Sequence, residues 1–195
     1  MKVVVVLAHP NADSFNRAIA TRALASLAEA GHDAQLVDLY ALGSKAAMSG
    51  EERVAYHTDR PILDPMIEAH AELVLGAEAL VFIYPTWWSS LPAILKGWLE
   101  RVMVPGVAFV FDESGKVQRN MTHIRRIVGI STYGSPRRYV RAINDNGRRT
   151  LTRALRMTCG VRTRCRWLGL YAIDTATPNQ RTRFLARVDK RMRSL

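Results

Sequence analysis

The chain of 195 residues is long enough to bury a real core, since hydrophobic residues make up 48% of it. No apolar run approaches the ~20 residues that a membrane-spanning helix needs, which excludes an integral membrane protein, and we expect a soluble, cytoplasmic one. The two cysteines, Cys159 and Cys165, match no zinc-binding spacing, so we expect reduced thiols and no metal site.

The net charge of +11 is distributed unevenly along the chain. Residues 119–195 carry nineteen Lys and Arg against three Asp and Glu, whereas residues 1–118 carry nine against fourteen. The basic residues are scattered through predicted helices and strands, which favours a solvated basic face over a specific nucleic-acid site. Attraction of anionic substrates, or weak contact with anionic surfaces, is the alternative that this charge leaves open.

Five predicted strands alternate with helices along the chain. The strands are expected at residues 2–8, 33–40, 79–85, 125–132 and 164–173. The helices are expected at residues 15–30, 66–75, 91–102, 138–157 and 178–192, with a short helical turn near 51–56 and a hairpin within 107–118. The first strand is a continuous β-branched run, which is typical of a strand buried on both faces of a parallel sheet.

This alternation predicts an α/β fold in which a five-stranded parallel sheet carries helices on both faces, a three-layer sandwich. We expect a single domain over residues 1–195, because the sequence contains no repeat, low-complexity tract or linker. In open α/β sheets, ligands bind outside the carboxyl ends of the strands. The candidate site therefore consists of the loops at residues 9–16, 85–92 and 131–139.

The first of these loops leads into the N-terminus of a helix, where free N–H groups and the helix dipole favour a phosphate. His9, Ser14 and Asn16 can add side-chain donors. The loop has neither a GxGxxG fingerprint nor a Walker A motif. The alternative is that Ser14 acts only as an N-cap.

The second loop carries adjacent tryptophans, Trp87 and Trp88, between two prolines that restrain its backbone. Such a loop can present the N–H groups of Trp87, Trp88 and Ser89 to the polar edge of a flat heterocycle, while an indole stacks on its ring. The alternative is that both tryptophans only pack against neighbouring elements or against a partner chain.

The third loop supplies small and hydroxylated residues, which suit close approach to a ligand: Ser131, Thr132, Gly134 and Tyr139. An ordinary polar turn is the alternative. One loop suited to phosphate and two loops able to hold a flat ring together indicate a flavin nucleotide.

Four segments carry a resemblance to a known family: "LAHPNADSFN", "YPTWWSSLPAILKGWLERVMVPGVAF", "GISTYG" and "LYAIDTATPNQRTRFLARVDKRM". Together they resemble the NAD(P)H:quinone oxidoreductases with a flavodoxin-like fold. The resemblance implies a tightly bound FMN or FAD, hydride transfer from NADH or NADPH to flavin N5, and two-electron reduction of a quinone or similar flat electrophile. It also implies a homodimer whose active sites are lined by both chains.

The resemblance also places individual residues by motif. Residues expected on the phosphate side of the flavin are His9, Ser14, Phe15 and Asn16. Residues expected around the ring are Pro85, Thr86, Trp87, Trp88 and Ser89, with Trp88 beside the isoalloxazine and Trp87 at the subunit contact. Residues expected at the other edge are Ser131, Thr132, Gly134 and Tyr139.

The sequence departs from the animal members of the family at three places. Tyr133 replaces a glycine, so we expect it to crowd or roof part of the flavin site. The segment at residues 41–61 is shorter, which slightly favours FMN over FAD. Asp145 stands where those enzymes have a histidine, so Tyr139 is expected to stabilise the reduced flavin with help from Arg138 or Arg141.

Other activities fit the same resemblance. The scaffold could reduce azo or nitro compounds or free flavins, or serve as an ancillary regulatory flavoprotein subunit of a membrane ion-efflux system. The basic second half of the chain favours NADPH over NADH as the coenzyme, with use of both coenzymes as the alternative.

Overall fold

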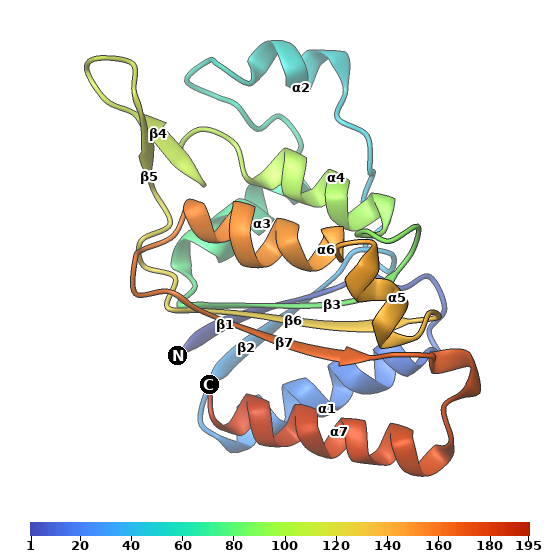
Figure 1. Cartoon of the computed structure of the whole chain (residues 1–195). Coiled ribbons are helices and arrows are strands. Elements are labelled where there is room, and N and C mark those ends of the chain that lie inside the picture. The colour runs from blue at the N-terminus through green and yellow to red at the C-terminus, as the bar shows by residue number, and fades with distance from the viewer.

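A five-stranded parallel sheet forms the middle layer of the computed structural model, which describes residues 1–195 (Figure 1). Its order is β2-β1-β3-β6-β7, and every neighbouring pair is parallel. The strands are β1 (Lys2–Leu7), β2 (Asp33–Asp38), β3 (Ala79–Thr86), β6 (Arg126–Tyr133) and β7 (Arg164–Leu170). The order reverses between β1 and β3, and this switch point is where such sheets bind ligands. The predicted fold class is confirmed.

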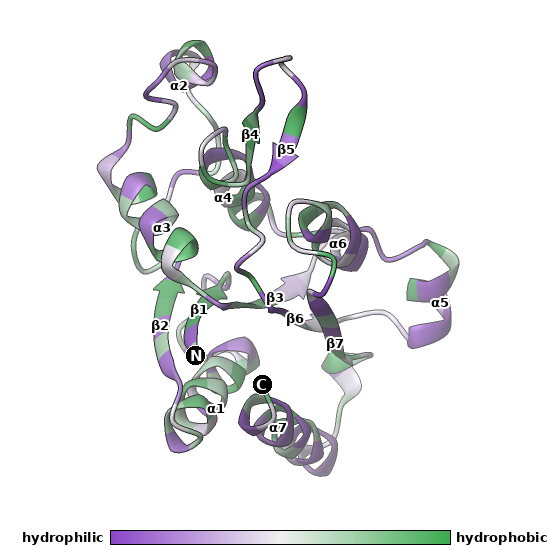
Figure 2. Ribbon diagram, turned by 90° about the vertical axis from the view of Figure 1, so that its left-hand side faces the viewer, coloured by the Kyte–Doolittle hydropathy of each residue, from purple (hydrophilic) through white to green (hydrophobic).

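Helices cover both faces of the sheet (Figures 1 and 2). One layer consists of α1 (Phe15–Glu29) and α7 (Pro178–Arg193). The other consists of α3 (Pro65–Gly76), α4 (Ala93–Val102), α5 (Arg137–Ala142), α6 (Asn146–Arg149) and the π-helix Thr150–Leu155. A hydrophobic cluster of 27 buried residues lies on the α3/α4 side and one of 16 on the α1/α7 side. The β-branched strands bury side chains in both clusters, as a parallel sheet requires.

Two shorter elements extend beyond the α3/α4 layer in Figure 1. They are α2 (Gly50–Ala55) and the antiparallel hairpin of β4 (Phe109–Phe111) and β5 (Val117–Arg119), and both were expected from the sequence. The remaining 3-10 helix, Ile173–Thr175, follows β7. No helix in the chain combines the length and the apolar character needed to cross a membrane.

The prediction of one long helix over residues 138–157 is wrong. Asn144 and Asp145 interrupt it with φ angles of 78° and 43°, in the left-handed region that Asn and Asp tolerate better than most residues. Asp145 then accepts a hydrogen bond from the backbone N–H of Arg148 and so caps a new helix, α6. This helix continues as the π-helix Thr150–Leu155, and the change of direction separates it from α5.

The segment between β2 and α3 is fastened to α4 by one buried arginine. Arg101 binds Glu52 and Asp64, each at 2.7 Å, and donates to the carbonyl oxygen of Lys45 at 3.0 Å. One turn earlier on the helix, a Cβ on Gly97 would lie 1.8 Å from the carbonyl oxygen of Ala46, so only glycine allows this close approach. The segment therefore forms a tight cover over α4.

Candidate functional site

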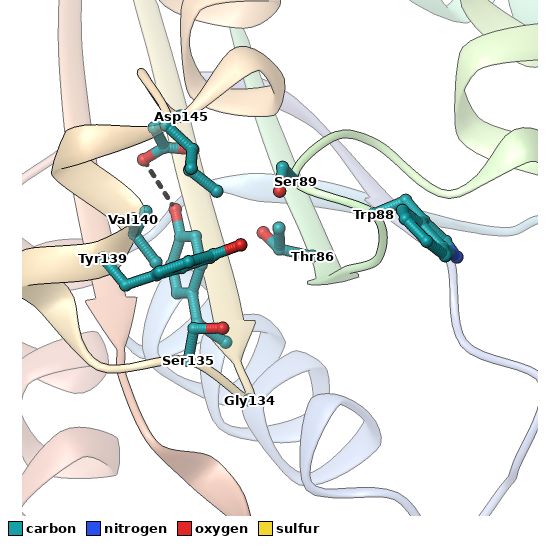
Figure 3. Close-up of a pocket in the computed structure, with 10 residues that line it drawn as sticks. Thr86, Trp88, Ser89, Gly134, Ser135, Tyr139, Val140 and Asp145 are labelled. Atoms are coloured by element: carbon teal, nitrogen blue, oxygen red, sulfur yellow. Dashed lines mark hydrogen bonds between the residues drawn. The ribbon is translucent and has the colours of Figure 1, made fainter.

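A pocket of about 260 Å³ opens at the carboxyl ends of β3 and β6 (Figure 3). Two of the three predicted loops supply its walls. The loop after β3 contributes Thr86, Trp88 and Ser89. The end of β6 and the segment through α5 contribute Tyr133, Gly134, Ser135, Tyr139, Val140, Ile143 and Asp145. Small-molecule pockets typically measure about 300–1,000 Å³, so this pocket can hold one part of a larger ligand.

The tryptophan loop closes in a tight turn with a strained backbone. Trp87 and Ser90 exchange two backbone hydrogen bonds, of 3.3 and 3.0 Å, across Trp88 and Ser89. Trp88 has φ 46° and Ser89 has φ 61°, in a region that costs non-glycine residues about 1–2 kcal/mol each. The Trp88 side chain is fully exposed, and Figure 3 shows it pointing away from Tyr139 on the far side of the loop. Strain combined with a large exposed aromatic marks a contact surface for a ligand or a partner.

Four backbone amides in the segments that follow β3 and β6 at the pocket have no hydrogen-bond acceptor within the protein. They belong to Trp88 and Ser89 in the tight turn and to Gly134 and Ser135 after β6. Unpaired donors on both walls suit the carbonyl and ring-nitrogen acceptors at the polar edge of a flat heterocycle. The donor set therefore fits the ring of a flavin.

Asn16, Ser131 and Thr132 were predicted in the site, but they do not line the pocket and instead form a framework of hydrogen bonds next to it. The Asn16 amide donates to Thr132 Oγ1 at 3.0 Å in a buried hydrogen bond, and the hydroxyls of Thr86 and Ser131 lie 2.8 Å apart. These contacts tie the first turn of α1 to β6 and the end of β3 to β6. Asn16 Oδ1 is buried and accepts no hydrogen bond, so this framework contains one unsatisfied acceptor.

The loop after β1 lies outside the pocket of 260 Å³. Ser14 Oγ accepts from the N–H of Arg17 at 3.2 Å, so it is an N-cap of α1, and the Phe15 ring packs against Phe184. Burial lowers the pKa of His9, whose Nδ1 accepts from the N–H of Asn11, and this favours the neutral ring. The free N–H groups in the first turn of α1 are then the donors left for an anion.

His9 also connects this loop to the tryptophan loop. Its ring centroid lies 6.3 Å from that of Trp87, which is 42% exposed. Pro85 precedes the loop as a buried residue of β3. The loops after β1 and β3 are thus neighbours, as the sheet order requires.

Tyr133, expected to crowd or roof part of the flavin site, forms a wall of the pocket. It is buried, and its ring stacks on Tyr171 with centroids 4.6 Å apart. Its hydroxyl donates to Asp145 Oδ2 at 3.0 Å and accepts from the indole N–H of Trp167 at 3.1 Å (the dashed line in Figure 3 marks the Asp145 bond). Burial raises the pKa of Tyr133 well above its usual range, so it keeps its proton.

Tyr139 and Asp145 both line the pocket, one from α5 and one from the turn that follows it. Tyr139 is half exposed, so its hydroxyl is available to a ligand. The side chains of Arg138 and Arg141, expected to assist it, do not line this pocket. Sequence reasoning missed Val140 and Ile143, although Ile143 follows Tyr139 at the helical spacing that places two residues on one face.

A family described as having a flavodoxin-like fold matches residues 1–194. The chain belongs to this family. Among curated relatives, NAD(P)H dehydrogenase [quinone] 1 of Rattus norvegicus is 31% identical over 156 residues, which is 71% of this chain and 56% of that protein. An uncharacterized NAD(P)H oxidoreductase of Haemophilus influenzae is 36% identical over 118 residues, 60% of this chain and 57% of that protein. The chain thus spans about half the length of these curated relatives.

Solved structures match the chain over nearly its whole length. The NAD(P)H:quinone oxidoreductase from Methanothermobacter marburgensis superposes with a TM-score of 0.82 and 25% identity, covering 98% of this chain and 95% of that one. A protein from Streptococcus mutans superposes with a TM-score of 0.84 and 25% identity, covering all of both chains.

Proposed function

We propose that the protein is a flavin-dependent NAD(P)H:quinone oxidoreductase. The observation that carries this proposal is the pocket at the carboxyl ends of β3 and β6, whose two walls present four unpaired amides beside an exposed tryptophan. It lies next to the switch point of the sheet, where this class of fold binds nucleotides. The names of the rat and Methanothermobacter marburgensis proteins support the same activity.

When bound, the flavin would accept a hydride from NAD(P)H and pass two electrons to a quinone. The amides of Trp88, Ser89, Gly134 and Ser135 would hold the polar edge of its ring, and the first turn of α1 would hold its phosphate. We propose FMN as the flavin, because the short segment between β2 and α3 is packed tightly on α4, which limits the room for an adenine half.

Tyr139 is the catalytic residue that we propose. Its half-exposed hydroxyl can donate to negative charge that develops on the flavin ring. Asp145 cannot do this when ionised, because a carboxylate has no proton to donate and its charge would oppose the new one. Its oxygens instead accept from Tyr133 and from the N–H of Arg148, so we assign it a positioning role at the turn between α5 and α6.

We also propose that the protein works as a homodimer. Exposed apolar side chains support this, because Trp88 in the site is fully exposed and Phe111 and Val117 on the hairpin are each about half exposed. Light scattering coupled to gel filtration measures the mass directly. A monomer at micromolar concentration would contradict the proposal.

The cofactor tests the proposed function first. The purified protein is expected to be yellow, and chromatography of the released flavin should identify FMN. Oxidation of NADH and NADPH is then followed with a benzoquinone as acceptor, and with azo and nitro compounds in parallel. A colourless protein that takes up neither FMN nor FAD would contradict the proposal, as would a flavoprotein that neither coenzyme can reduce.

A further inference from the structure

A second pocket, of about 360 Å³, lies beside the first and is lined by five arginines. Arg137 and Arg141 come from α5, Arg148 and Arg149 from α6, and Arg153 from the π-helix. We call it the arginine pocket. Its walls are the two helices that the turn at Asn144 and Asp145 separates, so the break in the expected long helix creates it.

None of these five guanidinium groups has an ion-pair partner. The seven ion pairs of the protein all involve other basic residues. The one carboxylate in the lining, Asp145, is buried and accepts the hydroxyl of Tyr133. Unpaired cations on facing walls repel one another, and an anion between them removes that repulsion. The pocket is therefore built for a strongly anionic group.

The arginine pocket adjoins the pocket proposed for the flavin. Both include Val140 and Asp145, and α5 presents Tyr139 to one pocket and Arg141 to the other. A single ligand can therefore place a flat ring against the first pocket and extend a phosphate into the second. Guanidinium groups bind phosphate oxygens in pairs, and an array of them discriminates strongly in favour of a phosphate dianion.

We propose that the arginine pocket binds the phosphate on the adenosine ribose of NADPH and so selects NADPH over NADH. This inference rests on the proposed function, because it requires a nicotinamide coenzyme that lies against a flavin held in the adjoining pocket. The two coenzymes differ only in this phosphomonoester, which adds about two negative charges near neutral pH. Four of the five arginines are exposed, so solvent and salt screen each of them, and it is their convergence on one phosphate that would distinguish the two coenzymes.

The test uses the whole protein with Arg137→Gln and Arg153→Gln combined, one change on each wall. The matched control is Arg183→Gln with Lys190→Gln, which removes the same charge from exposed positions on α7, across the sheet. Calorimetry measures binding of adenosine 2′,5′-bisphosphate and of 5′-AMP, and stopped flow measures reduction of the bound flavin by NADPH and by NADH. Calorimetry depends on neither flavin nor turnover.

The wild type and the control are expected to bind the bisphosphate at least about tenfold more tightly than 5′-AMP, and the arginine-pocket variant should lose most of that difference. The NADPH-to-NADH ratio of kcat/KM should fall by a similar factor. Equal binding of both nucleotides by the wild type, or an equal loss in the control, would overturn the inference. Binding to duplex DNA and to anionic vesicles is measured in parallel. If the arginine-pocket variant loses this binding but still binds the bisphosphate, the pocket belongs to a polyanion and the inference is overturned. If bisphosphate binds as expected but neither coenzyme reduces a flavin, the proposed function fails and the phosphate site stands.

Discussion

Replacing Trp88 with glycine should stabilise the flavin-free protein slightly and weaken its hold on the flavin. The side chain is fully exposed, so its removal takes away no core packing, and its φ of 46° suits glycine. Relief of the left-handed backbone contributes about 1–2 kcal/mol. The extra freedom of glycine in the unfolded chain offsets about 0.5–1 kcal/mol of that gain. The expected net change is a gain of about 0–1.5 kcal/mol in the free energy of unfolding.

Flavin affinity should change in the opposite direction. Stacking of a nucleic-acid base on an aromatic side chain is worth about 1–3 kcal/mol, and an indole beside the flavin ring should contribute on the same scale. Trp88→Gly is then expected to raise the Kd of the flavin by about 5- to 150-fold. Urea unfolding of the flavin-free protein measures the first effect, and quenching of flavin fluorescence on titration measures the second.

Ser89→Gly is the matched control, because it relaxes the neighbouring φ of 61° and leaves the indole in place. It should reproduce the gain in stability without the loss of affinity. The reasoning is refuted if Trp88→Gly destabilises the flavin-free protein by more than about 1 kcal/mol, which would show that the indole packs against protein. Unchanged flavin affinity in a folded variant would show that the ring does not contact the flavin.

Three further experiments test other parts of the structure. Burial lowers the pKa of His70, whose ring accepts a hydrogen bond from the buried indole N–H of Trp98. The free energy of unfolding should therefore be at its full value above about pH 6.5 and fall as the pH drops below it. His70→Gln keeps a hydrogen-bond acceptor and should remove this pH dependence, which urea unfolding between about pH 5 and 7 measures. Gly97→Ala should cost about 1–3 kcal/mol or more of unfolding free energy, because its Cβ would meet a backbone oxygen at 1.8 Å, whereas Gly76→Ala, with open space around it, should cost nothing. In single-turnover stopped flow, Tyr139→Phe should slow flavin reduction by about tenfold or more, and Asp145→Asn should leave it nearly unchanged or faster. The opposite pattern would make Asp145 the catalytic group.

The central strands β1, β3 and β6 were predictable because each contains a continuous run of buried residues, whereas the edge strands β2 and β7 alternate polar and apolar residues. The error at residues 138–157 came from treating helical periodicity as continuous across Asn144, Asp145 and Gly147. An Asn-Asp-Asn-Gly run is a turn signal, because Asn and Asp adopt the left-handed region and hydrogen-bond nearby backbone groups. Local turn chemistry here outweighed the periodic pattern on either side.

The loops of the candidate site were predictable from the rule that ligands bind at carboxyl strand ends, but the roles of single side chains were not. Asn16 and Thr132 bind each other, and Tyr133 turns inward to Asp145 and Trp167. These partners lie 116, 12 and 34 positions away in the chain, and only the folded sheet brings them together. A resemblance by motif identifies which loop faces a ligand. It does not identify which side chains of that loop hydrogen-bond to other residues of the protein and not to the ligand.

The strand order of the sheet places the acidic and the basic parts of the chain at opposite edges of the folded protein. Strands β2, β1 and β3 belong to the acidic first 118 residues, and β6 and β7, at the other edge, belong to the basic remainder. The folded protein is therefore an electric dipole across its strands, and an approaching anion experiences a torque as well as a pull. A coenzyme with an extra phosphate would arrive with that end already turned toward β7, whereas a neutral quinone would arrive in no preferred orientation. Added salt should consequently slow the approach of the reductant and leave that of the oxidant unchanged.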